Sequence, residues 1–386
     1  MENSKIKVAV VFGSRSVEHE VSIVTAMQVF ENINRKKYEV IPVYIDKSGR
    51  WLVDKKLEKL ESFRNLKLAD VNAPEYFLAA SPSVKALVPK SPFKFFDKIS
   101  PDIYFPLIHG TFGEDGTLQG LFEMADIAYT GSGVMGSAVG MDKIIQKSVF
   151  KDNGLPVVEC VWFFKNEWEN NKIDIIKNIE QKLNYPVFVK PANLGSSVAI
   201  SKAHGVKELE KAINIASQFD SRLLVEEAKE NIIEINCSVL GNDELTASVC
   251  EQPLKGEQML SYEDKYLKGG KVKGMAGLSR LVPAPISEKL AEKIQTMAKS
   301  AFRAVGVAGV ARIDFLVDEN NDEVWVNEIN TLPGSLSFYL WEKSGLNFTE
   351  LIDKIIALGF ERYKERQGLM FSYDSDLISK TGGNKN

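Results

Sequence analysis

Cysteine and histidine are scarce in this sequence. Its 386 residues include three cysteines, Cys160, Cys237 and Cys250, and three histidines. The cysteines are not paired at metal-binding spacing, which argues against a zinc module, and three are too few for the disulfide scaffold of a small secreted protein. We therefore interpret them as buried apolar side chains in a reducing environment, and we expect a cytoplasmic protein.

The chain also lacks long hydrophobic runs and an excess of charge of one sign. The first apolar run, residues 6–12, is too short for a signal peptide or a membrane span. The 48 lysines and arginines nearly balance 52 acidic residues, leaving a net charge of −4. No overall basic field is available to bind nucleic acid or an anionic membrane, so we expect neither partner. Any anion must be bound by a local site.

What the chain does have is enough apolar residues, 44% of the total, for two or three hydrophobic cores. The run at 6–12 reads as a buried strand, residues 18–33 have helical spacing, and residues 39–46 form a second strand. This strand, helix and strand predict a parallel sheet. We expect an N-terminal α/β domain over residues 1–130.

The pattern then changes from parallel to antiparallel. Glycine-rich residues 131–140 are interpreted as a linker, and residues 185–203 as two strands joined by a Gly/Ser loop. Residues 231–241 alternate polar and apolar side chains, as a half-exposed antiparallel strand does. We expect a central domain over residues 131–230.

A third domain is expected over residues 231–386. Residues 261–280 combine a Lys-Tyr pair with glycines and lysines, a composition typical of a mobile lid over a site, although an ordinary exposed loop has the same features. The polar tail from Tyr373 onward is expected to be frayed.

The segment 309–330, GVARIDFLVDENNDEVWVNEIN, predicts a hairpin with its turn near Asn321. Facing residue numbers should then sum to about 642. This register places Asp314 opposite Glu328 and Arg312 opposite Asn330 on one face of the hairpin. The other face is expected to be core and carries Ile313, Phe315, Trp325 and Ile329.

Two carboxylates and an amide oxygen that converge in this way favour a bound cation, and hard oxygen ligands suit Mg²⁺ rather than Zn²⁺. Arg312 beside them can hold a phosphoryl or acyl oxygen. The alternative is a solvated hairpin face with one Arg–Asp ion pair.

Charged residues upstream favour a nucleotide site. Lys143 opens a helix, and Lys190 ends a strand just before the loop PANLGSS. A lysine at such a strand end can reach a phosphate while the backbone N–H groups of the loop cover it. Glu226 and Glu227 end a later strand and suit an adenine amine and ribose hydroxyls, with Glu234 on the next strand. Taken singly, each of these is more often a solvated charge.

The two common nucleotide-binding motifs, the P-loop and the GxGxxG loop, do not support a nucleotide site. The sequence has no GxxxxGK[ST], which argues against a P-loop. GSGVMG at 131–136 matches GxGxxG, but the preceding residues 125–130 make a poor strand and no ribose-binding acid follows at the required distance. The match is therefore assigned to the linker.

Two polar positions occur in the first region. Glu18 lies at a helix start, where the helix dipole favours an acid, but it could also bind a substrate ammonium or orient a hydroxyl such as that of Ser196. His109 opens HGTFGEDGTLQG, a loop typical of close backbone approach to a ligand. A lone histidine is otherwise more often structural.

Seven motifs carry a family resemblance, in order along residues 8–360: VFGSRSVEHEVS, HGTFGEDGTLQG, YTGSGVMGSAVGMDK, FVKPANLGSSV, YEDKYL, ARIDF and NEINTLPG. With them the chain resembles D-alanine–D-alanine ligases of the ATP-grasp superfamily. The resemblance implies an α/β (α+β) fold with a Rossmann-like parallel domain and two antiparallel domains that clasp ATP. It also implies a homodimer.

The resemblance further implies an ATP-dependent ligase that joins two D-alanines through an acyl phosphate for peptidoglycan precursor synthesis. Glu18 would bind the first ammonium and form a lid-closing triad with Ser196 and Tyr266. Arg312 and the Gly334 N–H would stabilise the oxyanion. His109 would lie near the first substrate's carboxylate.

Further implied residues contact ATP and metal. Asp314, Glu328 and Asn330 would ligate two Mg²⁺ ions, for which Mn²⁺ could substitute. The implied ATP-binding residues are Lys143, Lys190, Glu226, Glu227, Ala228, Lys229, Glu234 and Lys265.

One departure from the family concerns the second amino acid. Only SLSFY, residues 335–339, separates NTLPG from LWE, where the family has a loop of roughly nine residues. Ser335 and Ser337 could bind the second carboxylate, while Phe338 and Tyr339 would reshape the pocket wall. The alternatives are a ligase that joins D-alanine to another small amino acid, or a nucleotide-binding protein without ligase activity.

Overall fold

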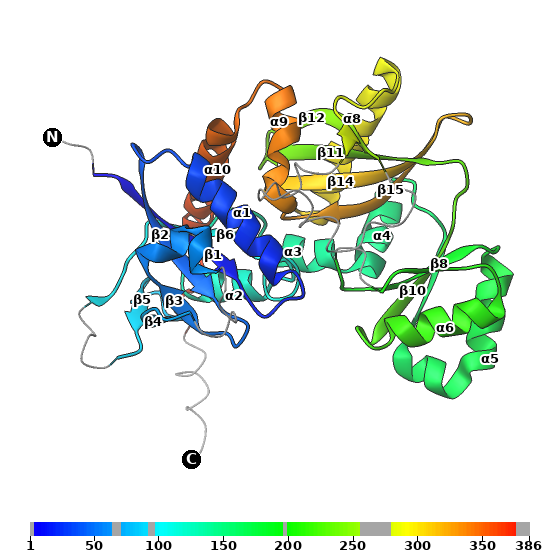
Figure 1. Ribbon diagram of the computed structural model, residues 1–386, viewed down its shortest axis with the longest axis horizontal. Coiled ribbons are helices and arrows are strands. Elements are labelled where there is room, and N and C mark those ends of the chain that lie inside the picture. The colour runs from blue at the N-terminus through cyan, green and yellow to red at the C-terminus, as the bar shows by residue number, and fades with distance from the viewer. Residues whose placement is uncertain (1–3, 64–70, 92–96, 196–198, 255–278, 376–386) are drawn as a thin grey trace, which may run out of the picture.

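The computed structural model describes residues 4–63, 71–91, 97–195, 199–254 and 279–375. The predicted site residues Ser196, Lys265 and Tyr266, and nearly all of the predicted lid, lie outside these ranges. The described strands form three sheets, which confirms the predicted α/β class. The first and second sheets lie toward opposite ends of the molecule, and the third lies between them (Figure 1).

The first sheet has a parallel centre, as predicted. Strand β1 (Ile6–Gly13) lies between β2 (Tyr38–Ile45) and β6 (Ile103–Pro106) and runs parallel to both. Helix α1 (His19–Asn32) is the crossover from β1 to β2. Because both faces of β1 are covered, residues 8–12 are fully buried, and the sequence there is apolar without alternation.

The outer half of the first sheet is antiparallel, so the sheet as a whole is mixed, with the predicted parallel pairing at its centre. Only residues 46–50 join β2 to the next strand, whereas a parallel crossover needs about a dozen. This half comprises the strands β3 (Trp51–Val53), β4 (Glu75–Leu78) and β5 (Leu87–Pro89), with the 3-10 helices η1 (Lys55–Glu58) and η2 (Leu60–Ser62).

The second sheet is antiparallel throughout, with strand order β7-β10-β8-β9. Helices α5 and α6 pack on it and close a core that contains Trp168, Ile213 and Val225. Its elements are β7 (Cys160–Phe164), α5 (Lys165–Lys182), β8 (Val187–Pro191), β9 (Ser201–Ala203), α6 (Val206–Ala216) and β10 (Arg222–Glu227).

The third sheet has the order β13-β12-β11-β14-β15, and helix α8 (Glu288–Val305) covers one face. The other face is partly covered by α9 (Phe338–Lys343), whose Trp341 donates to the Ser238 hydroxyl of β11 at 3.0 Å. Strand β11 is antiparallel as expected, but the expectation that it is half-exposed is wrong, because residues 235–241 are all buried. The strands are β11 (Ile233–Gly241), β12 (Thr246–Pro253), β13 (Arg280–Leu281), β14 (Gly309–Asp318) and β15 (Glu323–Asn330).

Residues 131–140 are not a linker, since they contain helix α3 (Val134–Met141), followed by α4 (Lys143–Asp152). A Cβ atom on Gly136 would lie 2.5 Å from the Gly306 carbonyl oxygen, and one on Gly140 would lie 2.5 Å from a Thr331 methyl group. The glycines therefore serve close packing of α3 against the third sheet, which local periodicity does not distinguish from a flexible stretch.

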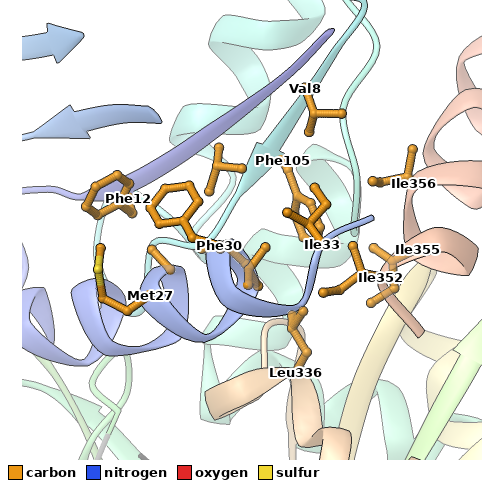
Figure 2. Packing of buried hydrophobic residues seen from close by; sticks show 14 of the residues in the cluster. Val8, Phe12, Met27, Phe30, Ile33, Phe105, Leu336, Ile352, Ile355 and Ile356 are labelled. Carbon is orange, nitrogen blue, oxygen red and sulfur yellow. The ribbon is translucent and has the colours of Figure 1, made fainter. Parts of the chain in front are cut away.

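The last helix, α10 (Phe348–Gln367), packs in a core shared by the first sheet and the end of the third, where Leu240 and Val310 lie. Figure 2 shows Ile352, Ile355 and Ile356 of this helix beside Val8 and Phe105 of β1 and β6. Burial of each isoleucine contributes about 1.5–3 kcal/mol to the free energy of folding. These contacts therefore stabilise the packing of α10 against the N-terminal strands.

The remaining described helices are short: α2 (Thr117–Met124) and the 3-10 helix η6 (Gly334–Ser337). Among the described residues, no helix combines the length and the apolar character needed to cross a bilayer. Of the three cysteines, Cys237 and Cys250 are buried as expected, and Cys160 is partly buried.

Candidate active site

The β14–β15 hairpin has the predicted register at its far end. Arg312 pairs with Asn330 and Asp314 with Glu328. Directly opposite residues of antiparallel strands share a face, so these four side chains lie together. The prediction from turn position and strand alternation is therefore confirmed for the two acids, the arginine and the amide.

A β-bulge after Asp314 shifts the register near the turn, so that Phe315 pairs with Val326. The expected core position of Trp325 is wrong, because the bulge sends the two valines that flank it into the core instead. Trp325 lies opposite Leu316 and is partly exposed, with the Lys229 ammonium 5.0 Å from its ring centroid. The expected core residues Ile313, Phe315 and Ile329 are buried.

The row of polar residues continues across the sheet beyond the hairpin. Asp314 pairs with Asn236 on β11, which pairs in turn with Glu251 on β12. The site face therefore carries Glu251, Asn236, Asp314 and Glu328 in one line across four strands. Glu234 lies on the same face, opposite Leu316. The sequence analysis did not single out Asn236 or Glu251, because strand pairing between them depends on tertiary contacts.

The Arg312 guanidinium binds both carboxylate oxygens of Asp314, at 2.6 and 2.7 Å, and the Asn330 amide donates to Asp314 at 3.1 Å. Burial raises the pKa of Asp314 to about 7, and the carboxylates of Glu328 and Glu234 act in the same direction while Arg312 opposes them. Burial would likewise raise the pKa of Glu328, but Lys143, Lys190 and Arg312 hold it below its ordinary value.

These donors fit a divalent cation of the hard type. Asp314 and Glu328 supply carboxylate oxygens and Asn330 an amide oxygen, the set that Mg²⁺ prefers. A cation near Asp314 would also hold ionised a carboxyl group whose pKa burial raises. The described part of the chain has no group of three His, Cys, Asp or Glu side chains placed to hold a metal, and here the third donor is the amide of Asn330.

Lys143 connects the loop after β8 with the hairpin. The Asp142 carboxylate caps α4 by accepting from two backbone N–H groups at 3.0 Å, which places Lys143 in the first turn. The Lys143 ammonium donates to the Leu194 carbonyl at 2.7 Å and lies 3.6 Å from the Glu328 carboxylate. The predicted lysine and one predicted metal-binding acid are therefore neighbours.

Lys190 and Glu226 form a buried ion pair with a third residue that the sequence analysis missed. Lys190 on β8 contacts Glu226 on β10, and Lys147 lies 2.9 Å from the other Glu226 oxygen. Burial opposes ionisation of Glu226, but the two lysines outweigh it and hold its pKa far below the ordinary value. The available signal for Lys147 was its position one helical turn after Lys143.

The other predicted ATP-binding residues follow β10. Glu227 pairs with Lys229 at 2.8 Å. The Ala228 N–H donates to the Pro186 carbonyl at 3.1 Å, so this strand end is tied to the loop before β8. Lys229 lies over Trp325, as described above, which brings the strand end to the site face of the third sheet.

Glu18 lies where three loops meet, and its side chain is buried. A Cβ atom on Gly110 would lie 2.6 Å from a Glu18 carboxylate oxygen, and one on Gly195 would lie 2.7 Å from the same oxygen. Glycine at both positions lets the backbone approach the carboxylate. The next residue after Gly195 is Ser196, the predicted partner of Glu18, which is outside the described residues.

His109 is buried among protein groups. Its Nε2 atom is 2.9 Å from the Thr25 hydroxyl, and its ring also hydrogen-bonds to the Leu332 backbone. Burial lowers the pKa of His109 to about 4, against the opposing effect of the Leu332 bond. The imidazole is therefore neutral at physiological pH.

The predicted second-substrate residues lie in η6, a turn in which Ser335, Leu336 and Ser337 all have positive φ, from 51° to 54°. Both serines are buried. Just after the turn, the Tyr339 hydroxyl donates to Glu251 at 2.9 Å, and the Arg280 guanidinium lies 3.8 Å from the Tyr339 ring centroid.

Two family models match the chain. The model described as D-ala D-ala ligase N-terminus matches residues 7–132, and the model described as D-ala D-ala ligase C-terminus matches residues 149–357. Together they span all three sheets.

Curated relatives are similar over nearly their whole length. The D-alanine–D-alanine ligase of Chloroherpeton thalassium is 41% identical over 369 residues, covering 94% of this chain and 99% of the relative. That of Ruminiclostridium cellulolyticum is 42% identical over 377 residues, covering 94% and 97%.

Solved structures of similar chains have the same fold. The VanG D-Ala:D-Ser ligase from Enterococcus faecalis aligns with a TM-score of 0.78 at 33% identity, covering 92% of this chain and 100% of that one. The D-alanine–D-alanine ligase from Coxiella burnetii also has a TM-score of 0.78, at 30% identity, covering 95% and 97%.

Proposed function

The chain belongs to the D-alanine–D-alanine ligase family, and we propose from this premise how its residues carry out the reaction. The chain is an ATP-dependent ligase that joins two D-alanines into D-alanyl-D-alanine, a precursor of peptidoglycan. The first carboxylate attacks the γ-phosphorus and displaces ADP, which gives an acyl phosphate. The second amine then attacks the acyl carbon, loses a proton and displaces phosphate.

One observation carries this assignment: consecutive residues of one loop contact both halves of the site. Lys143 binds the Leu194 carbonyl, and the next residue, Gly195, lies against the Glu18 carboxylate. Lys143 also approaches Glu328 of the hairpin. A group that binds ammonium and a group that binds phosphate are therefore held by adjacent residues of one loop, as a ligase that activates an amino-acid carboxylate requires.

At the nucleotide end, Lys143 and Lys190 would contact ATP phosphates, and Glu226 to Lys229 with Glu234 would hold adenine and ribose. The Glu226 carboxylate is occupied by Lys147 and Lys190, so we assign its backbone carbonyl to the adenine amine. The Glu226 carboxylate instead fixes the positions of the two lysines.

Asp314, Glu328 and Asn330 would hold Mg²⁺, which when bound neutralises charge on phosphoryl oxygens. The family is Mg²⁺-dependent, and the count of two ions, with Mn²⁺ as a substitute, is part of the proposal. Arg312 and the Gly334 N–H would stabilise the oxyanion of the tetrahedral intermediate. The roles predicted for Ser196, Lys265 and Tyr266 stay predictions.

At the amino-acid end, Glu18 would bind the first ammonium, with His109 nearby, and Ser335 and Ser337 would face the second amino acid. The Tyr339 ring, held by Glu251 and Arg280, would form the wall of the second pocket. A wall of this kind favours a small side chain such as that of D-alanine.

We also propose the quaternary structure, location and domain division. The protein would be a cytoplasmic homodimer, and its domains would comprise residues 1–130, 131–230 and 231–386. Each of the three sheets falls inside one of these ranges, which supports the division.

The test is phosphate release that depends on ATP and Mg²⁺, with D-alanine alone and then with D-alanine plus a panel of second amino and hydroxy acids. D-Serine belongs in the panel because one structural neighbour is a D-Ala:D-Ser ligase. We expect D-alanyl-D-alanine as the dominant product by mass spectrometry. A mixed dipeptide would contradict the assigned second substrate, and no release with any pair would contradict ligase activity.

A further inference from the structure

The backbone of Leu332 is held at its N–H and at its carbonyl by one loop. The Leu332 N–H donates to a Glu114 carboxylate oxygen at 3.2 Å, and the His109 ring hydrogen-bonds to the Leu332 backbone. Since the Leu332 N–H is bound to Glu114, the group that remains for the imidazole N–H is the Leu332 carbonyl. The other Glu114 oxygen accepts from the Gly110 N–H at 2.7 Å, which holds the loop itself in shape.

A second contact holds the chain three residues further on. The Ser335 N–H points at the Thr25 hydroxyl oxygen at 3.4 Å, and the same hydroxyl lies 2.9 Å from His109 Nε2. Thr25 is on α1, so the first domain reaches this segment from two elements. Leu332 and Ser335 are therefore both fixed, and Gly334 lies between them.

We propose that His109, Glu114 and Thr25 are positioning residues that fix the segment Leu332–Ser335 and so aim the backbone N–H of Gly334 at the reacting carbonyl. The inference rests on the oxyanion role assigned to Gly334 in the proposed function. It gives HGTFGEDG a different task from direct substrate binding.

The hydrogen-bond inventory determines the state of the imidazole. A ring nitrogen that donates to the Leu332 carbonyl carries the proton, and the nitrogen facing the Thr25 hydroxyl accepts. Nε2 is the atom next to Thr25, so His109 is neutral with its proton on Nδ1. Burial, which lowers the pKa of His109, agrees with this state. Both ring nitrogens are then used by the protein.

The first test is Thr25→Val, which keeps the shape of the side chain and removes its hydroxyl. Thr25→Ser, which keeps the hydroxyl, is the matched control. We expect Thr25→Val to slow dipeptide formation by roughly tenfold to a hundredfold, since a displacement near 1 Å can cost about 10²-fold. Acyl-phosphate formation, followed by positional isotope exchange in labelled ATP, and ATP affinity should stay unchanged. Thr25→Ser should restore the rate.

Equal loss of both half-reactions, or a Thr25→Val enzyme as fast as Thr25→Ser, would overturn the proposal. Glu114→Gln provides a second variant should Thr25→Val fold poorly. Its amide offers one acceptor oxygen where two backbone N–H groups converge, so the second half-reaction should again be the slower one. If Glu114→Gln slowed neither half-reaction more than the other, the positioning role of Glu114 would be contradicted.

A spectroscopic measurement separates this proposal from the proposed function. The chain has three histidines, so nitrogen-labelled histidine gives a simple spectrum in which His109 is assigned by His109→Gln. We expect the Nδ1–H tautomer at neutral pH in both proteins, and in Thr25→Val a shift of the Nε2 resonance, because that nitrogen has lost its hydrogen-bond donor. An Nε2–H or doubly protonated ring would overturn the network even in an active ligase. An inactive protein with the expected tautomer would instead overturn the ligase assignment.

Discussion

Replacing Lys147 by methionine tests the buried ion pair beneath the nucleotide end of the site. The Lys147 and Glu226 side chains are each 3% exposed, and their charged atoms lie 2.9 Å apart. Methionine has a similar length and no charge, so the substitution leaves Glu226 with Lys190 alone. Removing one partner of a buried pair costs about 3–5 kcal/mol, and because Lys190 remains we expect the lower end, about 3 kcal/mol.

The chain offers a matched control on the same helix. Lys151 lies one turn after Lys147 and pairs with Glu159 at 3.2 Å, but these side chains are 67% and 64% exposed. Solvent screens an ion pair of this kind, so Lys151→Met should change the free energy of unfolding by at most about 1 kcal/mol.

The assay is urea unfolding of both variants, with the affinity for ATP measured alongside. We expect Lys147→Met to be much less stable than Lys151→Met. We also expect it to bind ATP more weakly, since Glu226 is no longer fixed by Lys147 and therefore positions Lys190 less firmly. A double-mutant cycle with Glu226→Gln should give a coupling of about 1–3 kcal/mol. Equal stability of the two methionine variants would refute the reasoning.

Three further outcomes follow from the site. Arg312→Ala should lower turnover by about 10²–10³-fold or more while ATP binding survives, and loss of ATP binding would show that the arginine is structural. Asp314→Asn should raise the Mg²⁺ concentration for half-maximal phosphate release by at least about tenfold, and an unchanged titration would remove Asp314 from the metal site. Burial lowers the pKa of His109 from 6.5 to about 4, so the unfolded state takes up its proton first and the native state should lose about 3 kcal/mol as pH falls through this window. His109→Gln should flatten that part of the stability profile, and an identical slope in both proteins would contradict it.

The sequence alone was sufficient for the pairing of Asp314 with Glu328. An antiparallel hairpin has its register set by its turn, and strand alternation then decides which side chains share a face. The same local logic failed eleven residues later along the hairpin, at Trp325. One extra residue in a bulge reverses every side chain beyond it, and no local signal marked that residue.

The glycines of α3 illustrate the same limit. In the sequence, residues 131–140 have the composition of a flexible linker. In the structure, Gly136 and Gly140 are needed because Gly306 and Thr331, which pack against them, leave no room for a Cβ atom. The sequence shows that a residue is a glycine. Only the tertiary contacts show whether that glycine serves flexibility or close packing.

The sequence by itself determined the strand and helix pattern of each region, the polar face of the hairpin and the family, because each depends on residues that are close along the chain or on ordered motifs. The tertiary structure alone decided that Lys147 meets Glu226, that Lys143 meets Glu328 and that His109 and Glu114 hold Leu332. These pairs are separated by 79 to 223 positions in the numbering. Their contact depends on how the three sheets turn toward one another, and a buried lysine or acid has the same letter as a solvated one.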